Sequence, residues 1–107
     1  MNKDKVMYME KKIILDDYEY NLVKNYKDGF QLELIQEKYT DYFEPFDYIF
    51  GDFSYDKLRL KGFYEHDNST VKEINDINNL ENYISDYCSF DCRYFLLKKS
   101  KKVNKNS

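Results

Sequence analysis

The sequence predicts an α+β domain with a mostly antiparallel sheet and two helices. Short runs rich in Ile, Leu, Tyr and Phe recur between turn residues, as strands do. Two longer segments carry apolar residues at spacings of three and four, as amphipathic helices do. The expected chain order is (β)β-α-β-β-α-β, which is compatible with a ferredoxin-like split βαβ arrangement.

A hairpin is expected first. Residues 13–15 and 18–23 are two β-prone runs, and the acidic pair Asp16-Asp17 separates them. Asp tolerates the backbone conformations that tight turns require, and so short a connection suits two antiparallel strands. We therefore predict that these two runs pair with each other.

A helix is expected over residues 29–43. Asp28 stands three residues before Gln31, which is the spacing of a capping box at a helix start. Pro45 follows the segment, and proline cannot continue a helix. The apolar residues of this segment that share one helical stripe are Leu32, Ile35, Tyr39 and Tyr42.

The second half of the chain is expected to hold a second hairpin, a helix and a last strand. Residues 47–53 and 57–64 form the hairpin, and the polar, Asn-rich stretch over 66–79 is expected to be a loop. A helix should then run to about Cys88, followed by a strand over 92–98. The stripe that predicts this helix consists of Ile77, Leu80, Ile84, Tyr87 and Cys88.

The register of the second hairpin decides which side chains share a face, because a slip of one residue turns every side chain over. Pairing Phe53 with Lys57 would mix apolar and charged groups on both faces. Pairing Phe53 with Leu58 instead collects an apolar face, so we predict this register. Its members are Ile49, Gly51, Phe53, Leu58 and Leu60.

The opposite face of the hairpin is the candidate partner-binding face. It consists of Tyr48, Phe50, Asp52, Arg59, Lys61 and Phe63. Asp52 lies directly across from Arg59, where a charge pair is favourable. If the face is open, it presents the residue types that are enriched at interface hot spots. The structural alternative is that the N-terminal hairpin covers the aromatic residues and that Asp52 merely orients Arg59.

Three segments of the chain carry a family resemblance. They are residues 25–30 (NYKDGF), the YIFGD and LRLKGFY stretches within 48–64, and the Tyr87, Cys88, Cys92, Tyr94 and Phe95 group. Together they resemble the YutD-like family of small proteins from low-GC Gram-positive bacteria, over roughly residues 18–98. The resemblance implies a cytoplasmic housekeeping or regulatory role. It carries over no catalytic residue, cofactor or partner.

Composition and charge set the domain organisation. With 107 residues, of which 42% are hydrophobic, the chain can build one core. We expect a flexible arm over 1–10, a single domain over 11–98 and a mobile basic tail over 99–107. Residues 98–107 contain five Lys and no acid, whereas residues 1–97 contain twelve basic and twenty acidic side chains. An acidic body disfavours general binding to phosphate backbones.

The cysteines are expected to be reduced and structural. The chain shows no export signal and no membrane-spanning run, so we expect a cytoplasmic protein. A metal site at Cys88 and Cys92 would need two more ligands, and the one histidine is His66. A redox pair is an alternative, although these residues flank a predicted helix end, where thiolates are disfavoured. We expect no metal and no cofactor.

No catalytic motif is complete. His66 lies between Glu65 and Asp67, an acid-base group without a nucleophile placed beside it. The stretch Lys61-Gly62-Phe63 matches the start of an RNA-recognition signature, but the residues that follow do not. We therefore expect an interaction or regulatory module that binds a protein partner. RNA binding through an aromatic sheet face and the basic tail is the second hypothesis, an enzyme is the third, and no DNA-specific motif is present.

Overall fold

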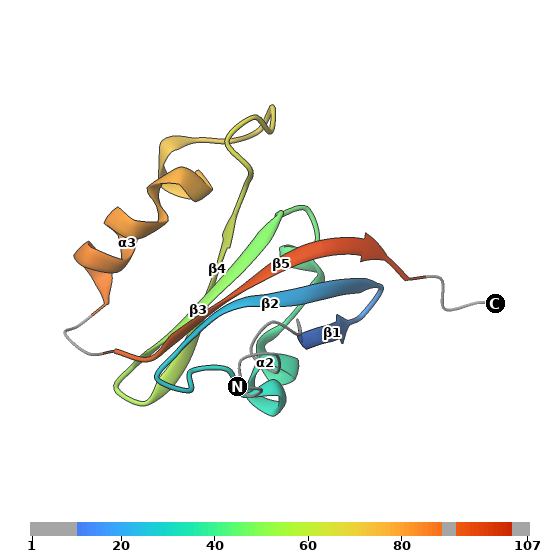
Figure 1. Ribbon diagram of the computed structural model, residues 1–107. Coiled ribbons are helices and arrows are strands. Elements are labelled where there is room, and N and C mark those ends of the chain that lie inside the picture. The colour runs from blue at the N-terminus through green and yellow to red at the C-terminus, as the bar shows by residue number, and fades with distance from the viewer. Residues whose placement is uncertain (1–10, 89–91, 104–107) are drawn as a thin grey trace, which may run out of the picture.

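The computed structural model describes residues 11–88 and 92–103. This part of the chain forms a five-stranded sheet, two α-helices and three 3₁₀ helices (Figure 1). The predicted α+β class, with two helices and an antiparallel sheet, is confirmed. The strands are β1 (Lys11–Leu15), β2 (Tyr18–Tyr26), β3 (Tyr48–Ser54), β4 (Lys57–Phe63) and β5 (Tyr94–Lys102); the helices are α2 (Leu32–Lys38) and α3 (Leu80–Tyr87).

The strand order in the sheet is β1-β2-β5-β3-β4. The last strand in the chain therefore lies between the two hairpins, and Figure 1 shows β5 running alongside β2. Each of the four strand pairs is antiparallel. The ferredoxin-like arrangement is not confirmed. The chain order also departs in part from the prediction, because 3₁₀ helices lie in two of the connections. One connection joins α2 to β3, and the other joins β4 to α3.

The centre of β5 is buried on both sides. Phe95, Leu96 and Leu97 follow one another and are at most 4% exposed, as expected for a strand with packed faces above and below. Gly51 on β3 lies opposite Phe95. A Cβ atom at Gly51 would lie only 2.1 Å from the Phe95 ring, so this contact requires glycine.

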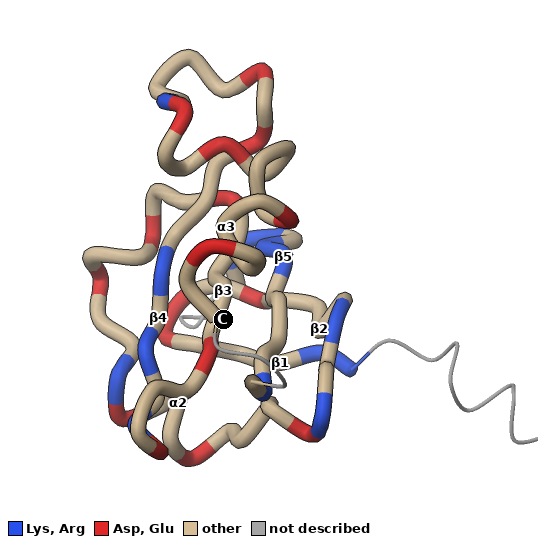
Figure 2. Tube along the Cα trace, turned by 90° about the vertical axis from the view of Figure 1, so that its left-hand side faces the viewer, with Lys and Arg blue, Asp and Glu red and all other residues tan. Residues whose placement is uncertain are grey.

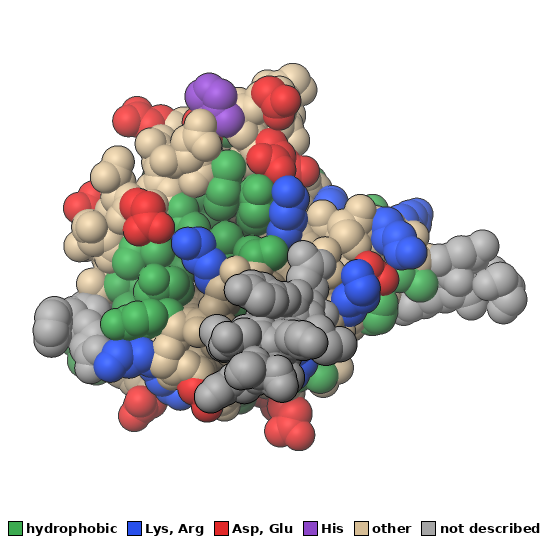
Figure 3. Space-filling model, viewed as in Figure 1, with side chains coloured by type: hydrophobic (Ala, Val, Ile, Leu, Met, Phe, Trp, Pro, Cys, Tyr) green, Lys and Arg blue, Asp and Glu red, His purple; other side chains and the backbone are tan. Residues whose placement is uncertain are grey.

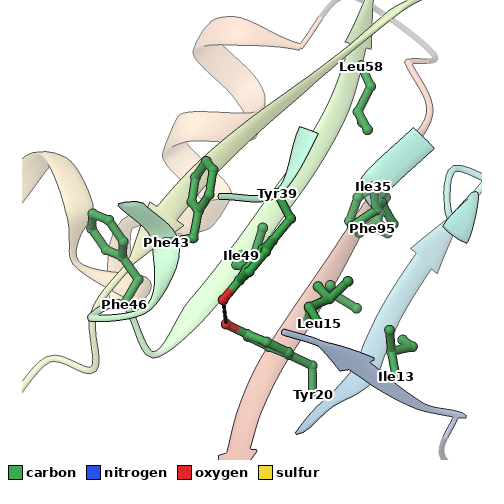
Figure 4. Close-up of a cluster of buried hydrophobic side chains, with 11 residues drawn as sticks. Ile13, Leu15, Tyr20, Ile35, Tyr39, Phe43, Phe46, Ile49, Leu58 and Phe95 are labelled. Carbon is green, nitrogen blue, oxygen red and sulfur yellow. Dashed lines mark hydrogen bonds between the residues drawn. The ribbon is translucent and has the colours of Figure 1, made fainter. Parts of the chain in front are cut away.

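The larger of two hydrophobic clusters lies on the sheet face that α2 covers. Figure 4 shows side chains from β1, β2, β3 and β5 meeting those of α2 and the turn after it. The hydroxyl groups of Tyr20 and Tyr39 point toward each other at 3.3 Å. This hydrogen bond satisfies polar atoms that would otherwise be costly to bury. The buried members are Ile13, Leu15, Tyr20, Ile35, Tyr39, Phe43, Phe46, Ile49, Leu58, Phe95 and Leu97.

The second cluster lies on the opposite face of the sheet, beneath α3. Along β3, Ile49 belongs to the first cluster, whereas its neighbours Tyr48 and Phe50 belong to the second. This alternation places the two clusters on opposite faces, because successive strand residues point to opposite sides. The second cluster consists of Tyr48, Phe50, Phe63, Leu80 and Leu96.

Both predicted hairpins form. Leu15 pairs with Tyr18 across the Asp16-Asp17 turn. In the second hairpin Phe53 pairs with Leu58 and Asp52 pairs with Arg59, so the predicted register is confirmed. Tyr55 and Asp56 occupy its turn with φ angles of 53° and 64°, the left-handed conformation typical of two-residue hairpin loops.

The first helix is shorter than predicted. It ends at Lys38, because Tyr39 takes an extended conformation and the chain then turns into the 3₁₀ helix η1 (Asp41–Phe43). This break allows Phe43 to enter the core, while Tyr42 is left 66% exposed. The capping role expected of Asp28 is wrong as well, since Asp28 adopts a φ of 58° in a turn and Gln31 is the N-cap residue.

The boundary expected for the basic tail is corrected. Residues 99–102 belong to β5, where Lys99 pairs with Tyr20 and Lys102 pairs with Tyr18. The Lys99 side chain donates a hydrogen bond to the Glu44 carbonyl and lies over the Tyr18 ring. Residues 98–102 are four Lys and one Ser, which give no apolar pattern, so the sequence does not indicate where the strand ends. The expected arm over 1–10 and residues 104–107 lie outside the described residues.

Deleting residues 99–107 should destabilise the protein. The truncation removes backbone hydrogen bonds from Lys99 to Asp47 (2.9 Å) and from Val103 to Asp17 (2.6 Å), along with the pairing to β2. Each such bond contributes about 1 kcal/mol, so the melting temperature should fall by about 5–10 °C in thermal denaturation. Replacing Lys101 and Lys102 with Thr keeps the backbone and is the matched control. Equal melting temperatures for the truncated and full chains would contradict the role of this strand end.

Candidate functional site

The aromatic residues of the candidate partner-binding face are buried. Tyr48, Phe50 and Phe63 are 9%, 1% and 0% exposed. The expectation that they are open to a partner is wrong, and so is the alternative that the N-terminal hairpin covers them. Helix α3 is the cover, because its stripe of Leu80 and Ile84 needs an apolar surface to pack against. Figure 3 shows hydrophobic side chains gathered around α3, with acidic side chains outside them.

Asp52 and Arg59 form a two-bonded ion pair at the edge of this cluster. Arg59 donates from Nε to Oδ1 of Asp52 at 2.9 Å and from Nη2 to Oδ2 at 2.6 Å. Asp52 is 2% exposed, whereas the Arg59 side chain is 45% exposed. The hydrogen bonds to Asp52 raise the pKa of Arg59 above its usual value. Arg59 therefore neutralises a buried carboxylate and still reaches the surface.

Cys88 is a second hydrogen-bond donor to Asp52. Its Sγ atom lies 3.3 Å from Oδ2 of Asp52, and both cysteines are free thiols. Burial, followed by hydrogen bonding to Cys92 and Asp52, raises the pKa of the Cys88 thiol, so the nucleophilic thiolate is disfavoured. Among residues 11–88 and 92–103, no group of three His, Cys, Asp or Glu side chains is arranged to hold a metal ion. These observations support a packing role for Cys88.

Lys61 is a half-buried cation. Its Nζ atom lies 4.9 Å from the centre of the Phe63 ring and 5.5 Å from that of Tyr83. Burial lowers the pKa of Lys61. No described carboxylate forms an ion pair with it, so aromatic rings alone compensate its partial loss of water.

A surface hollow of about 260 Å³ lies beside Lys61, which we call the β4-edge hollow. Tyr42 and Ile74 contribute to its lining and are 66% and 68% exposed. Ile74 also lines a larger groove of about 470 Å³ along α3, together with Tyr83 and Tyr87. Neither residue stands out in the sequence, because Tyr42 fits the apolar stripe expected for a helix and Ile74 lies in a stretch expected to be a polar loop.

The loop between β4 and α3 is ordered by a pair of side chains. His66 Nδ1 lies 2.6 Å from Oδ2 of Asp76, and Oδ1 of Asp76 accepts a hydrogen bond from the Asn78 amide at 2.9 Å. Asp76 thereby caps the 3₁₀ helix η3 (Ile77–Asn79). Tyr64 adds backbone hydrogen bonds to Asn75 and Ile77. His66 thus has a carboxylate partner but no adjacent nucleophile among the described residues.

A family model, a protein of known sequence and a solved structure all match this chain, and all three carry the same family name. A family model described as "YutD-like: Putative antitoxin YutD-like" matches residues 14–98. The protein named "Putative antitoxin YutD" from Bacillus subtilis (strain 168) is 42% identical over 90 residues, which cover 84% of this chain and 99% of that protein. The solution NMR structure of protein yutD from B. subtilis superimposes with a TM-score of 0.75 and 38% identity, and covers 94% of each chain.

Replacing Arg59 with Ala should destabilise the fold. The change leaves the buried Asp52 carboxylate without its cation, which costs about 1–3 kcal/mol once the exposure of Arg59 is taken into account. The double variant Asp52→Asn with Arg59→Ala should be more stable than Arg59→Ala alone, because the buried charge is removed. Urea denaturation measures both. A loss below about 0.5 kcal/mol for Arg59→Ala would assign Arg59 no structural role.

The His66 imidazole should titrate above its ordinary pKa of 6.5. The hydrogen bond to Asp76 raises the pKa of His66, and the pKa of Asp76 is lowered by its hydrogen bonds to Asn78 and His66. The contact therefore stabilises the loop fully below about pH 6.5, and this contribution is lost as the pH rises through the raised pKa of His66. Below about pH 3.8 it is lost again as Asp76 becomes protonated.

A proton NMR titration of His66 checks this expectation. Asp76→Asn should return the midpoint toward 6.5, while Asp67→Asn, which removes a weaker influence, should change it less. A midpoint at or below 6.5 in the unmodified protein would show that the His66–Asp76 contact does not persist in solution.

Proposed function

Because the chain belongs to the YutD-like family, we propose that it is a small cytoplasmic interaction module that acts by holding a protein partner, as an antitoxin holds its toxin. The observation that carries this proposal is the surface beside β4. There an unpaired sheet edge, the unmatched cation Lys61 and the exposed side chains Tyr42 and Ile74 lie together. Exposed apolar residues beside a charged residue are typical of binding surfaces.

The name of the Bacillus relative supports the same class of function. "Putative antitoxin YutD" describes a protein that would act against a toxin. The groove along α3 is open rather than enclosed, and the one histidine, His66, lies on an exposed loop outside its lining. An enzyme is therefore the weakest of the three hypotheses.

RNA binding is less well supported than protein binding. The aromatic rings of β3 and β4 that would stack on bases lie beneath α3. Several lysines expected to be mobile pair with β2 instead, and Lys99 is engaged with Glu44 and Tyr18. The acidic body also repels a phosphate backbone.

None of the helices in the described part of the chain has the length and apolar character to cross a bilayer.

A two-step experiment tests the proposed function. The tagged chain, expressed in its own cells, should copurify with one protein in near-equal amount, and ribonuclease treatment should leave the complex intact. The partner expressed alone in a second host should slow growth, and coexpression of this chain should restore it. A complex that dissociates on ribonuclease treatment would favour the RNA-binding hypothesis. A partner without any effect on growth would overturn the antitoxin role.

A further inference from the structure

The outer edge of β4 is open. Strand β4 lies at one end of the sheet and pairs with β3 alone. An antiparallel strand with one neighbour directs half of its backbone N–H and C=O groups away from the sheet. Helix η2 (Glu73–Asn75) and the loop around it make their backbone hydrogen bonds just beyond the strand, where Tyr64 bonds Asn75 and Ile77. Gly62 and Phe63 are buried, so the stretch from Lys57 to Lys61 is the part of β4 that is available to a further strand.

The side chains along this edge carry a pattern of positive charge. Lys57, Arg59 and Lys61 occupy alternate positions and therefore project from the same side of β4. Figure 2 shows the basic positions spaced along the β4 tube. Asp52 already matches the charge of Arg59. Lys57 and Lys61 form no ion pair with any residue that the structure describes, so two cations are unmatched.

The other side of β4 is apolar near its centre. Leu60 is half-buried, and the Phe46 ring covers Gly62 so closely that a Cβ atom there would lie 2.2 Å away. Tyr42 lies beside Phe46, with 5.6 Å between the ring centres. These groups line the β4-edge hollow, so an apolar side chain entering from the open edge would find partners there.

We propose that β4 binds an extended segment of a protein partner as an added strand of the sheet, with acidic side chains facing Lys57 and Lys61 and apolar side chains facing Leu60 and Tyr42. The inference rests on the proposed function and names the site and the chemistry of the partner segment. Backbone hydrogen bonds supply the pairing in this mode of recognition, and the alternating side chains supply the specificity. Opposite charges directly across neighbouring strands are favourable.

Lysines on an edge strand also have a protective role, since they discourage pairing with other chains. That role calls for charges in water, and Lys57 meets it. Lys61 does not, because its ammonium group is held over the Phe63 and Tyr83 rings beside a hollow. The combination of an unmatched, partly desolvated cation and neighbouring apolar groups favours an acidic strand over a merely protected edge.

A synthetic peptide in which glutamate alternates with valine is the probe. In a ¹⁵N NMR titration of the full chain it should shift the amide signals of β4 and slow their hydrogen exchange. The peptide with lysine in place of glutamate should bind at least about tenfold more weakly. Methylating alternate backbone nitrogens should abolish binding when the methyl groups face β4 and preserve it when they face away.

Charge-reversal variants localise the binding. Lys61→Glu should weaken binding of the glutamate peptide at least about tenfold, and Lys57→Glu, at an exposed position, should weaken it without any effect on folding. Lys102→Glu is the matched control on a distant strand and should change binding by less than about twofold. Shifts confined to β1, equal binding by all variants, or insensitivity to N-methylation would each overturn strand addition at β4.

The two proposals fail separately. A wild-type chain that does not bind the glutamate peptide, yet forms the stoichiometric complex described above with unchanged β4 signals, overturns the strand-addition site and leaves the proposed function standing. A chain that binds the peptide as expected but whose partner has no effect on growth overturns the antitoxin role and keeps the site.

Discussion

The structure depends on β5 being inserted between β2 and β3. A two-stranded hairpin is at best marginally stable in water, and this chain contains two of them. Strand β5 joins them into one sheet by pairing with β2 over its whole length and with β3 at its start. Its side chains also enter both hydrophobic clusters, with Phe95 and Leu97 on one face and Leu96 on the other. Neither cluster can close without this strand.

The close contact between β3 and β5 shows how tightly this arrangement constrains the sequence. Phe95 fills the space above Gly51, so a residue with a side chain at position 51 would collide with the fully buried Phe95 ring. The buried charge beside it is equally constrained. Asp52 follows Gly51 on the other face and is compensated by Arg59 and Cys88, from a neighbouring strand and the end of α3. The pair therefore links the hairpin to the helix that covers it.

The local features of the fold could be predicted from the sequence, and the reasons are physical. The register of the β3–β4 hairpin followed from segregating apolar and charged residues, because only one pairing put Phe53 and Leu58 together. The end of β5 could not be predicted, since Lys99 and Lys102 are held by backbone pairing rather than by an apolar pattern. The early end of α2 was equally hidden, because Tyr39 and Phe43 reach the core through a 3₁₀ turn that a regular stripe does not describe.

Only part of the candidate site could be predicted from the sequence. Lys61 and Arg59 were identified from their positions on the hairpin, but the cover over Phe50 and Phe63 is a tertiary contact made by α3, far along the chain. Tyr42 and Ile74 have no signal of their own in the sequence. They become notable only because η1 and η2 place them next to an open strand, which is a property of the assembled sheet.

The central position of β5 also has a consequence for synthesis. The ribosome translates Tyr94–Lys102 after the other four strands, so a growing chain carries two hairpins whose inner edges, on β2 and β3, have nothing to pair with. During that interval the side chains of Ile49 and Phe50 are without their β5 neighbours, and such exposed edges attract proteases, chaperones and other nascent chains. A ribosome that stops before this strand therefore releases two hairpins without the strand that joins them into one sheet.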